Sequence, residues 1–428
     1  MLSTSVSISV QPGSALVDDS VDIVVKNLKP KQKVTIASYS NDSNVKMVSN
    51  AYFEANDNGQ VSCTNDESLG GTYKGKHADG LFWSQKNAIN QRDGLRYLKK
   101  DITTPINVKL AVFDGHIDIC DEKPFTSNSY LSVTQLDRWY LDQENVDRKE
   151  IAEGNIRGTL FMPKGKGPFK GIVDLFGTGG GLFEHRGALF SSRGFAVLCL
   201  GYFDYRDIPP NIDIPLDYFE EGVKFLESQE KVEKGGVGVI GLSLGAEIAL
   251  MMVNYIPLVK AACIINGTAF LTFERKYKGR LVAEKTTDMD YDRIVNTEEG
   301  MVFKGVSQHY TPESVLPLNQ TADCRIMVIA GEDDCNTDSV LSGHIVRDQI
   351  KKLNYNNFEM LSYPNTGHLI EPPHSPLCKV CYHKYVGTNL IYGGSTYEHA
   401  MAQIDSWRKM KNFFKKYVPN GNVPKSNY

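Results

Sequence analysis

Apolar residues in roughly the first 140 positions come in short, partly alternating runs rich in β-branched and aromatic side chains. Runs of this kind predict strands, and turn signals such as Asn56-Asp57-Asn58-Gly59 separate them. Few stretches in this part keep the period of a helix. The pattern therefore predicts a β-sandwich, with strands expected at residues 21–28, 32–39, 47–55 and 106–115.

From Gly171 onward, near-continuous apolar runs alternate with helical segments. This alternation is typical of βαβ units, in which helices cover both faces of a parallel sheet. The polar segment 141–158, which precedes this region, either connects two domains or forms an edge hairpin. The expected strands are residues 171–177, 194–203, 236–243, 259–267, 324–331 and 358–364, and the expected helices are residues 215–229 and 245–255.

The length of 428 residues exceeds what one hydrophobic core usually holds, which favours two domains. We place a β-sandwich at residues 1–145 and an α/β domain with a mostly parallel sheet at residues 155–420. A content of 41% hydrophobic and 23% charged residues is typical of globular proteins. The sequence indicates no oligomeric state.

Charge and hydropathy limit the partners. A net charge of −4 is not the strongly basic balance of a nucleic-acid-binding protein, and no apolar run is long enough to cross a membrane. The N-terminus lacks the pattern of a signal or transit peptide, and the last residues are not a peroxisomal tripeptide. We therefore expect no nucleic-acid partner, no integral membrane segment and a cytoplasmic location.

The eight cysteines are spread over the chain without secretory context, so we expect them to be reduced. Cys378 and Cys381 have C-x-x-C spacing, with His374 and His383 on either side. A four-ligand metal site would need a second pair at a standard spacing, and the sequence offers none. We expect a structural role for these two cysteines, no metal site and no cofactor.

The pentapeptide Gly241-Leu242-Ser243-Leu244-Gly245 follows an apolar strand and precedes a helical pattern. In a nucleophile elbow, serine occupies a sharp strand-to-helix turn, and glycines flank it because side chains would clash there. The alternative is an ordinary serine in a glycine-rich loop, and the five residues alone do not decide between the two. The strand and helix around them favour Ser243 as a nucleophile.

A serine nucleophile needs a base, and in this arrangement an acid and then a histidine follow the serine along the chain. His368 ends a strand-and-turn segment, which is where a sheet presents such a histidine. His344 lies in a helical pattern, and His374, in a proline-rich loop, is the nearest alternative. The histidines that follow Ser243 are residues 309, 344, 368, 374, 383 and 399.

The acid is expected where the strand at 324–331 ends in Glu332, Asp333 and Asp334. Acidic clusters are usually solvated loop tips, and this holds for at least two of the three. One carboxylate at the end of a sheet strand, ahead of His368, fits the acid that orients a histidine. Position alone does not choose between Asp333 and Asp334.

Negative charge that develops on a substrate oxygen needs backbone N–H donors. One donor is expected at Leu244, directly after the nucleophile. The other is expected from the loop Gly177-Thr178-Gly179-Gly180-Gly181, at Thr178 and Gly179, because glycines let the backbone approach a ligand closely. The same loop lacks the lysine and the spacing of a phosphate-binding Walker A sequence.

Several longer segments resemble the family of acyl-CoA thioesterases and bile acid-CoA:amino acid N-acyltransferases. The resemblance covers nearly the whole chain. It implies an N-terminal immunoglobulin-like β-sandwich, a C-terminal α/β-hydrolase domain related to dienelactone hydrolases, and an acyl-CoA substrate. The segments are VDLFGTGGGLFEHR (173–186), GLSLGAE (241–247), AGEDD (330–334), YPNTGHLIEPPHSPLC (363–378), GGSTYEHAMAQIDSWRKMKNFF (393–414), SLGGTYKGKHADGLFWS (68–84) and INVKLAVFDGH (106–116).

The resemblance also implies roles for single residues. The family's nucleophile, acid and histidine correspond to Ser243, Asp334 and His368, which selects Asp334 over Asp333. The chain departs from the family at Leu244, where relatives often carry lysine or glutamine next to the acyl pocket or the CoA entrance.

The implied reaction is acyl transfer from a CoA thioester to Ser243 and then to an acceptor. Water as the acceptor makes the protein a thioesterase, and an amino acid makes it an N-acyltransferase. In the family the cysteine-bearing members are the amidating ones, and this chain has serine, so we expect hydrolysis. A carboxylesterase or dienelactone-type hydrolase and a non-enzymatic binding module are the alternatives. Arg186, Arg275 and Lys276 are candidates to meet the CoA phosphates.

Overall fold

The computed structural model describes residues 5–127, 129–283, 290–306, 312–318 and 323–419, which form two compact units. Each unit combines segments that are far apart in the sequence. Unit 1 consists of Met1–Tyr140, Glu371–Cys381 and Ser395–Ile404, and unit 2 consists of Leu141–Ile370, Tyr382–Gly394 and Asp405–Tyr428. The domain limits 1–145 and 155–420 stay a prediction.

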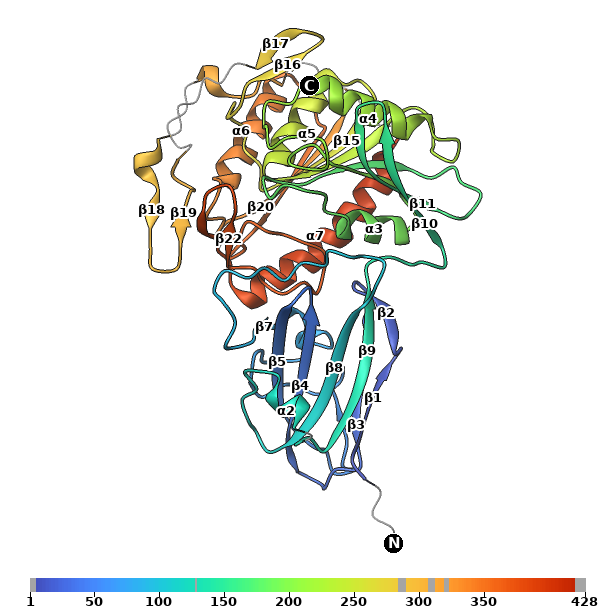
Figure 1. The fold of residues 1–428 in the computed structure, drawn as a ribbon, viewed down its shortest axis with the longest axis vertical. Coiled ribbons are helices and arrows are strands. Elements are labelled where there is room, and N and C mark those ends of the chain that lie inside the picture. Colours follow the sequence, from blue (N-terminus) through green and yellow to red (C-terminus); the bar gives the residue numbers. More distant parts are fainter. Residues whose placement is uncertain (1–4, 128, 284–289, 307–311, 319–322, 420–428) are drawn as a thin grey trace. The chain divides into compact units, whose positions relative to one another are not determined.

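Unit 1 is built from two sheets (Figure 1). Within the described residues, its strands pair in antiparallel fashion except β2 and β9, which are parallel. The first sheet has the order β1 (Ser7–Gln11), β3 (Asp22–Lys26), β6 (Val61–Ser62). The second has the order β2 (Ser14–Leu16), β9 (Ser132–Trp139), β8 (Ile106–Asp114), β4 (Lys33–Asp42), β5 (Val45–Glu54), β7 (Lys86–Asn87), and two single-turn helices accompany them, α1 (Gly80–Trp83) and α2 (Lys123–Thr126).

The four strands expected in unit 1 correspond to β3, β4, β5 and β8. Their side chains alternate between the core and solvent only in part, because β4 and β5 are buried over most of their length. The strand β9 is not among the expected elements. Its sequence SVTQLDRW carries polar residues at most positions, so the apolar signal of a half-buried strand is weak.

Unit 2 contains one sheet of eight strands. Six neighbouring strands pair in parallel, in the order β13, β12, β14, β15, β20, β21. The two strands at one edge, β10 and β11, are antiparallel to each other, and β11 is antiparallel to β13. The prediction of a mostly parallel sheet is confirmed, and the polar segment after residue 141 forms an edge hairpin. The strand order is β10 (Val146–Glu153), β11 (Ile156–Pro163), β13 (Ala196–Leu200), β12 (Gly171–Leu175), β14 (Val237–Leu242), β15 (Val259–Ile265), β20 (Arg325–Gly331), β21 (Phe358–Tyr363).

Helices cover both faces of this sheet (Figure 1). One face packs against α4 (Leu216–Ser228), α5 (Leu244–Tyr255) and α6 (Ser339–Lys352) through a continuous apolar core. On the other face, Phe190 of α3 (His185–Ser192) contacts Trp407 and Phe414 of α7 (Thr396–Tyr417), with ring centroids 4.3 and 5.9 Å apart. No helix within the described ranges is long and apolar enough to cross a membrane.

Smaller elements lie outside the main sheet. A hairpin joins β16 (Arg275–Tyr277) and β17 (Arg280–Ala283). A four-stranded sheet has the order β18 (Val295–Asn296), β19 (Met301–Val302), β23 (Thr388–Ile391), β22 (Val380–His383), and 3₁₀ turns occur at Tyr291–Arg293 and Pro312–Ser314.

The strand order determines where a ligand fits. The chain leaves β12 toward β13 on one side and returns to β14 on the other side, so the connections diverge beside β12. In open α/β sheets, ligands bind outside the carboxyl ends of the strands at such a switch point. Gly177 follows β12 and Ser243 follows β14, and these two strands are direct neighbours.

Candidate active site

Ser243 stands between β14 and α5 in a left-handed backbone conformation, with φ 56° and ψ −121°. A residue with a side chain adopts this conformation only at a cost in free energy, and such strain is common at nucleophile elbows. The flanking glycines are required by space: a Cβ on Gly241 would lie 2.1 Å from the Gly245 carbonyl oxygen. A Cβ on Gly245 would lie 2.6 Å from the Phe176 carbonyl oxygen, so the predicted sharp turn is present.

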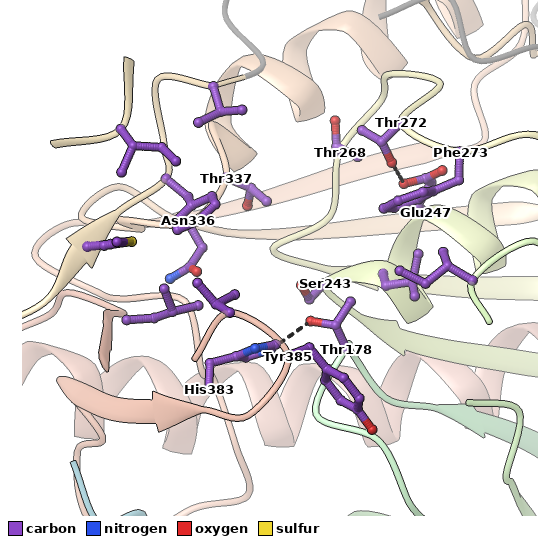
Figure 2. A pocket seen from close by; sticks show the side chains of 18 of the residues that line it. Thr178, Ser243, Glu247, Thr268, Thr272, Phe273, Asn336, Thr337, His383 and Tyr385 are labelled. Atoms are coloured by element: carbon purple, nitrogen blue, oxygen red, sulfur yellow. Dashed lines mark hydrogen bonds between the residues drawn. The ribbon is translucent and has the colours of Figure 1, made fainter. Parts of the chain in front are cut away.

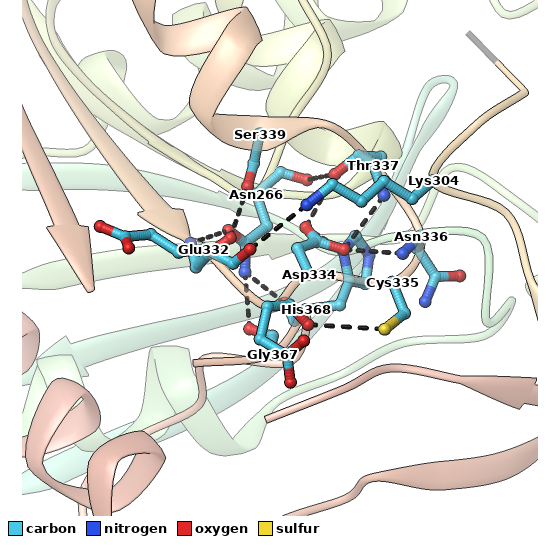
Figure 3. Close-up of polar contacts among 12 residues, drawn as sticks. Asn266, Lys304, Glu332, Asp334, Cys335, Asn336, Thr337, Ser339, Gly367 and His368 are labelled. Atoms are coloured by element: carbon cyan, nitrogen blue, oxygen red, sulfur yellow. Dashed lines mark hydrogen bonds and ion pairs between the residues drawn. The ribbon is translucent and has the colours of Figure 1, made fainter. Parts of the chain in front are cut away.

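Asp334 and His368 form a buried hydrogen-bonded pair (Figure 3). The His368 Nδ1 lies 2.8 Å from the Asp334 Oδ2. The other carboxylate oxygen accepts bonds from the backbone N–H groups of Asn336 and Thr337, at 2.8 and 3.0 Å. Because a carboxylate only accepts, Nδ1 of His368 carries the hydrogen and Nε2 is left with a free lone pair.

Asn266, which follows β15, joins neighbouring strand ends by hydrogen bonds, and the sequence interpretation missed it. Its Nδ2 donates to the carbonyl oxygen of His368 at 2.7 Å, and its Oδ1 accepts from the N–H of Gly331 at 2.8 Å. The preceding residue, Ile265, accepts from the N–H of Ser243 at 3.0 Å. One loop thus links the histidine, the end of β20 and the serine. Its only signal in the sequence is an asparagine directly after an apolar strand.

The side chains of Ser243 and His368 are not in hydrogen-bond contact with each other. Among the described residues, no hydrogen bond joins the Ser243 hydroxyl to the His368 ring. In enzymes that use a serine and a histidine, this hydrogen bond is often long without a substrate and tightens in its presence. The two side chains do share the carboxyl edge of one parallel sheet, through the links just described.

The glycine-rich loop lies against the serine. A Cβ on Gly177 would be 3.0 Å from the Ser243 Cβ and 3.5 Å from its Oγ, so only glycine leaves the hydroxyl its space. Thr178 lines the same cavity as Ser243, and its Oγ1 lies 3.1 Å from the Nε2 of His383. Leu244 is the first residue of α5, where backbone N–H groups have no partner inside the helix. Gly177, Thr178 and Leu244 thus lie around the serine. Gly179 instead lies against Phe183, where a Cβ would be 2.9 Å from the ring.

The alternatives from the sequence lie elsewhere. His374 belongs to unit 1, where its Nδ1 lies 2.7 Å from the carbonyl oxygen of Val17. His344 is exposed on α6, and His309 lies outside the described residues. Asp333 is exposed, and its Oδ2 accepts from the N–H of Gly394 at 2.7 Å. Of the two aspartates, only Asp334 is hydrogen-bonded to a histidine.

A cavity of about 550 Å³ opens over Ser243, and each described residue that lines it belongs to unit 2 (Figure 2). Most of its wall is apolar, including Phe203, Phe273, Phe303 and Val306. Leu244 also lines it, as expected for a residue beside an acyl pocket. The shape and polarity suit a hydrophobic chain attached at Ser243.

Two titratable groups in the cavity wall were not expected from the sequence. Burial raises the pKa of Glu247 to about 7. His383 also lines the cavity, and burial together with the nearby charge of Lys384 lowers the pKa of its imidazole, which is therefore neutral at pH 7. Glu247 stands in the segment GLSLGAE, but nothing in that segment indicates that its carboxyl group lines a cavity. His383 was missed because tertiary structure brings it to the cavity wall from a distant part of the chain.

The arginine at position 186 is not available for CoA phosphates, contrary to the expectation. Its guanidinium and the carboxylate of Asp174 are both 3% exposed, and they form a two-pronged ion pair. Burial acts to lower the pKa of Arg186, but the charge and hydrogen bonds of Asp174 outweigh it and raise that pKa. Arg275 is buried as well, whereas Lys276 is exposed. The Asp174–Arg186 pair joins β12 to α3, the two elements that flank the glycine-rich loop.

Replacement of Arg186 by methionine is expected to lower the free energy of unfolding by about 3–5 kcal/mol, because it leaves the Asp174 charge buried and unpaired. Urea unfolding followed by circular dichroism measures the change. The double variant Asp174→Asn with Arg186→Met should recover part of the loss. Arg408→Met, which removes a solvent-exposed partner of Asp405, should change little. A loss for Arg186→Met no larger than for Arg408→Met would contradict the assignment.

Comparison with known proteins identifies the family. The model described as BAAT / acyl-CoA thioester hydrolase C terminal matches residues 214–420, and the model of the acyl-CoA thioester hydrolase/BAAT N-terminal region matches residues 18–153. The chain belongs to this family. Three curated relatives are similar to this chain over nearly its whole length, so the family assignment covers both units.

A mouse relative, acyl-coenzyme A amino acid N-acyltransferase 1, is 37% identical over 95% of this chain and 96% of its own length. Human acyl-coenzyme A thioesterase 1 is 34% identical, again over 95% of this chain and 96% of its own length. The mouse peroxisomal succinyl-coenzyme A thioesterase is 34% identical over 96% of this chain and 97% of its own.

Among solved structures, a putative dienelactone hydrolase from Klebsiella pneumoniae is 15% identical and covers 64% of this chain and 98% of its own, with a TM-score of 0.40.

Proposed function

We propose that this family member hydrolyses fatty acyl-CoA thioesters to free fatty acid and CoA through a serine acyl-enzyme intermediate. The observation that carries the proposal is the buried hydrogen bond between Asp334 and His368, at the sheet edge that also bears Ser243. The apolar cavity over Ser243 supports an acyl chain as the group that is transferred.

In the proposed mechanism, the Ser243 Oγ attacks the thioester carbonyl carbon while the Nε2 of His368 takes its proton. Asp334 holds the ring in the required tautomer and stabilises the imidazolium. The N–H of Leu244 and an N–H at Thr178 or Gly179 stabilise the oxyanion. His368 then gives its proton to the leaving sulfur of CoA. In the second half, His368 deprotonates a water that attacks the acyl-serine, and it then returns that proton to the Ser243 Oγ as the ester bond breaks and the fatty acid leaves.

We propose water as the acceptor because the acyl-enzyme formed on Ser243 is an oxygen ester. An amine has less advantage over water with an oxygen ester than with a thioester, so an acyl-serine favours hydrolysis. Amino acid N-acylation is the second candidate, because the 37% identical mouse relative carries that name. For unit 1 we propose the immunoglobulin-like class of β-sandwich, which its two mostly antiparallel sheets support.

The test is turnover of acyl-CoA substrates of increasing chain length and of simple aryl esters, each with and without glycine or taurine. We expect CoA release with equal amounts of free fatty acid, unchanged by the amine. Product analysis by mass spectrometry separates the outcomes. An amide product in the presence of the amine would establish the N-acyltransferase instead. Turnover of the aryl esters alone would point to a carboxylesterase.

A further inference from the structure

A carboxyl group that the proposed mechanism does not use lies in the wall of the acyl cavity. Glu247 lies in the first turn of α5, which begins directly after Ser243, and both side chains line the same cavity (Figure 2). Ser243 is the N-cap of α5 and Glu247 stands in its first turn, so the two side chains enter the cavity from the same end of one helix. The first few carbons of a chain attached to Ser243 are therefore within reach of Glu247.

The Glu247 side chain is held on one side and unsatisfied on the other. The Thr272 hydroxyl donates a hydrogen bond to its Oε2. Its Oε1 has no hydrogen-bond partner, although the residue is only 1% exposed. Buried polar atoms in folded proteins nearly always have a partner, so an unpaired carboxyl oxygen in a ligand cavity indicates that the ligand supplies one.

Arg275 is the charged neighbour of this carboxyl group. Its positive charge acts to lower the pKa of Glu247, but burial prevails, and both the acid and the carboxylate are present near pH 7. The two side chains form no ion pair, and Arg275 instead donates through Nη1 to the carbonyl oxygens of Ile212 and Glu274, at 2.6 and 3.1 Å. Glu247 lines the cavity and Arg275 does not, so an entering group meets the carboxyl first.

We propose that Glu247, fixed by Thr272, binds a hydroxyl group on the substrate's acyl chain a few carbons from the thioester, so that the protein prefers hydroxylated over unsubstituted acyl-CoA. The inference rests on the proposed acyl-CoA function and adds the class of acyl group.

The chemistry of the carboxyl group selects a hydroxyl over other substituents. A hydroxyl donates to the carboxylate and accepts from the acid, so it satisfies Glu247 in either protonation state. An unsubstituted chain leaves the oxygen unpaired, and a site built to bind a substrate hydroxyl discriminates against the analogue that lacks it. A terminal carboxylate on the chain is repelled by the ionised form.

The experiment compares octanoyl-CoA with 3-hydroxyoctanoyl-CoA and 5-hydroxyoctanoyl-CoA in CoA-release assays on the full chain. For the wild type we expect kcat/KM to be about tenfold higher for at least one hydroxylated substrate, the effect of one hydrogen bond. In Glu247→Leu this ratio should fall to about one. In Glu247→Gln, whose amide still donates and accepts, it should stay within a few-fold of the wild type.

Two controls separate a specificity role from a structural one. Glu274→Leu replaces an exposed glutamate outside the cavity wall and should leave the ratio at the wild-type value. Equilibrium binding of the same three compounds to Ser243→Ala, with Glu247 intact, should show the hydroxylated substrate bound about tenfold more tightly. This measurement tests the inference even where Glu247→Leu does not fold.

The outcomes are distinct. No CoA release from any acyl-CoA would overturn the proposed function itself. Release at equal kcat/KM for octanoyl-CoA and both hydroxylated analogues, with equal binding to Ser243→Ala, would overturn only the inference about Glu247. Preference for glutaryl-CoA over octanoyl-CoA that is lost in Arg275→Met would assign this end of the cavity to Arg275 and a carboxylate, and would overturn it too.

Discussion

Replacement of Ser243 by alanine is expected to lower kcat/KM for acyl-CoA hydrolysis by at least about 10⁴-fold, because no acyl-enzyme can form without the hydroxyl. Alanine keeps the Cβ, so the left-handed turn at φ 56° and its glycine neighbours are unchanged in their steric demands. CoA release, detected with a thiol reagent, measures the loss. A fluorophosphonate probe should label the wild type and not the variant.

The matched control is Ser228→Ala, which removes an exposed hydroxyl on α4 and should retain full activity. Binding of acyl-CoA to Ser243→Ala should persist, which separates loss of chemistry from loss of fold. A Ser243→Ala protein that keeps more than about a tenth of wild-type turnover would disprove the assignment of Ser243 as the nucleophile.

Replacement of Asp334 by asparagine is expected to reduce turnover by about 10⁴-fold, the scale seen when the acid of such a triad is replaced by its amide. The asparagine oxygen can still accept from the N–H groups of Asn336 and Thr337. Its NH₂ group then faces the His368 Nδ1, and a donor there favours the tautomer whose Nε2 is protonated. That nitrogen can no longer take the proton from serine.

Asp333→Asn is the control next in the chain. Asp333 is exposed, and its side chain accepts a hydrogen bond from the N–H of Gly394 rather than from a histidine, so we expect an effect within a few-fold. Both variants are compared in CoA-release assays at saturating and limiting substrate. Equal losses for the two variants, or a larger loss for Asp333→Asn, would refute the choice of Asp334.

Most strands of the main sheet were predictable because nearly all of their residues are buried, as in β12, β13, β14, β15 and β20, whereas β21 is only half-buried. The six expected strands from 171 to 364 all correspond to strands of this sheet, namely β12, β13, β14, β15, β20 and β21, with ends that differ by a few residues. The elements that were not expected, among them β9 and α7, mix polar and apolar residues. Trp407 and Phe414 of α7 pack against Phe190 of α3, which is far away in the sequence, so no local sequence pattern predicts this contact.

The candidate site divides in the same way. Ser243 and the glycine-rich loop were predictable because sharp turns demand glycine at particular positions. A Cβ on Gly241 or Gly245 would clash with a backbone oxygen, and a Cβ on Gly177 would press against the Ser243 Cβ at 3.0 Å. The choice between Asp333 and Asp334 was not readable from position. The turn after β20 directs Asp334 inward to His368 and leaves Asp333 exposed.

The sequence by itself determined which segments form the buried parallel strands, where the elbow lies and which family the chain resembles, since these depend on neighbours in the chain. Only the tertiary structure decided that Asn266 links the strand ends, that Arg186 is locked to Asp174, and that Glu247 and His383 enter the cavity wall. Burial, hydrogen bonding and pKa depend on what packs around a side chain, and those neighbours come from distant parts of the chain.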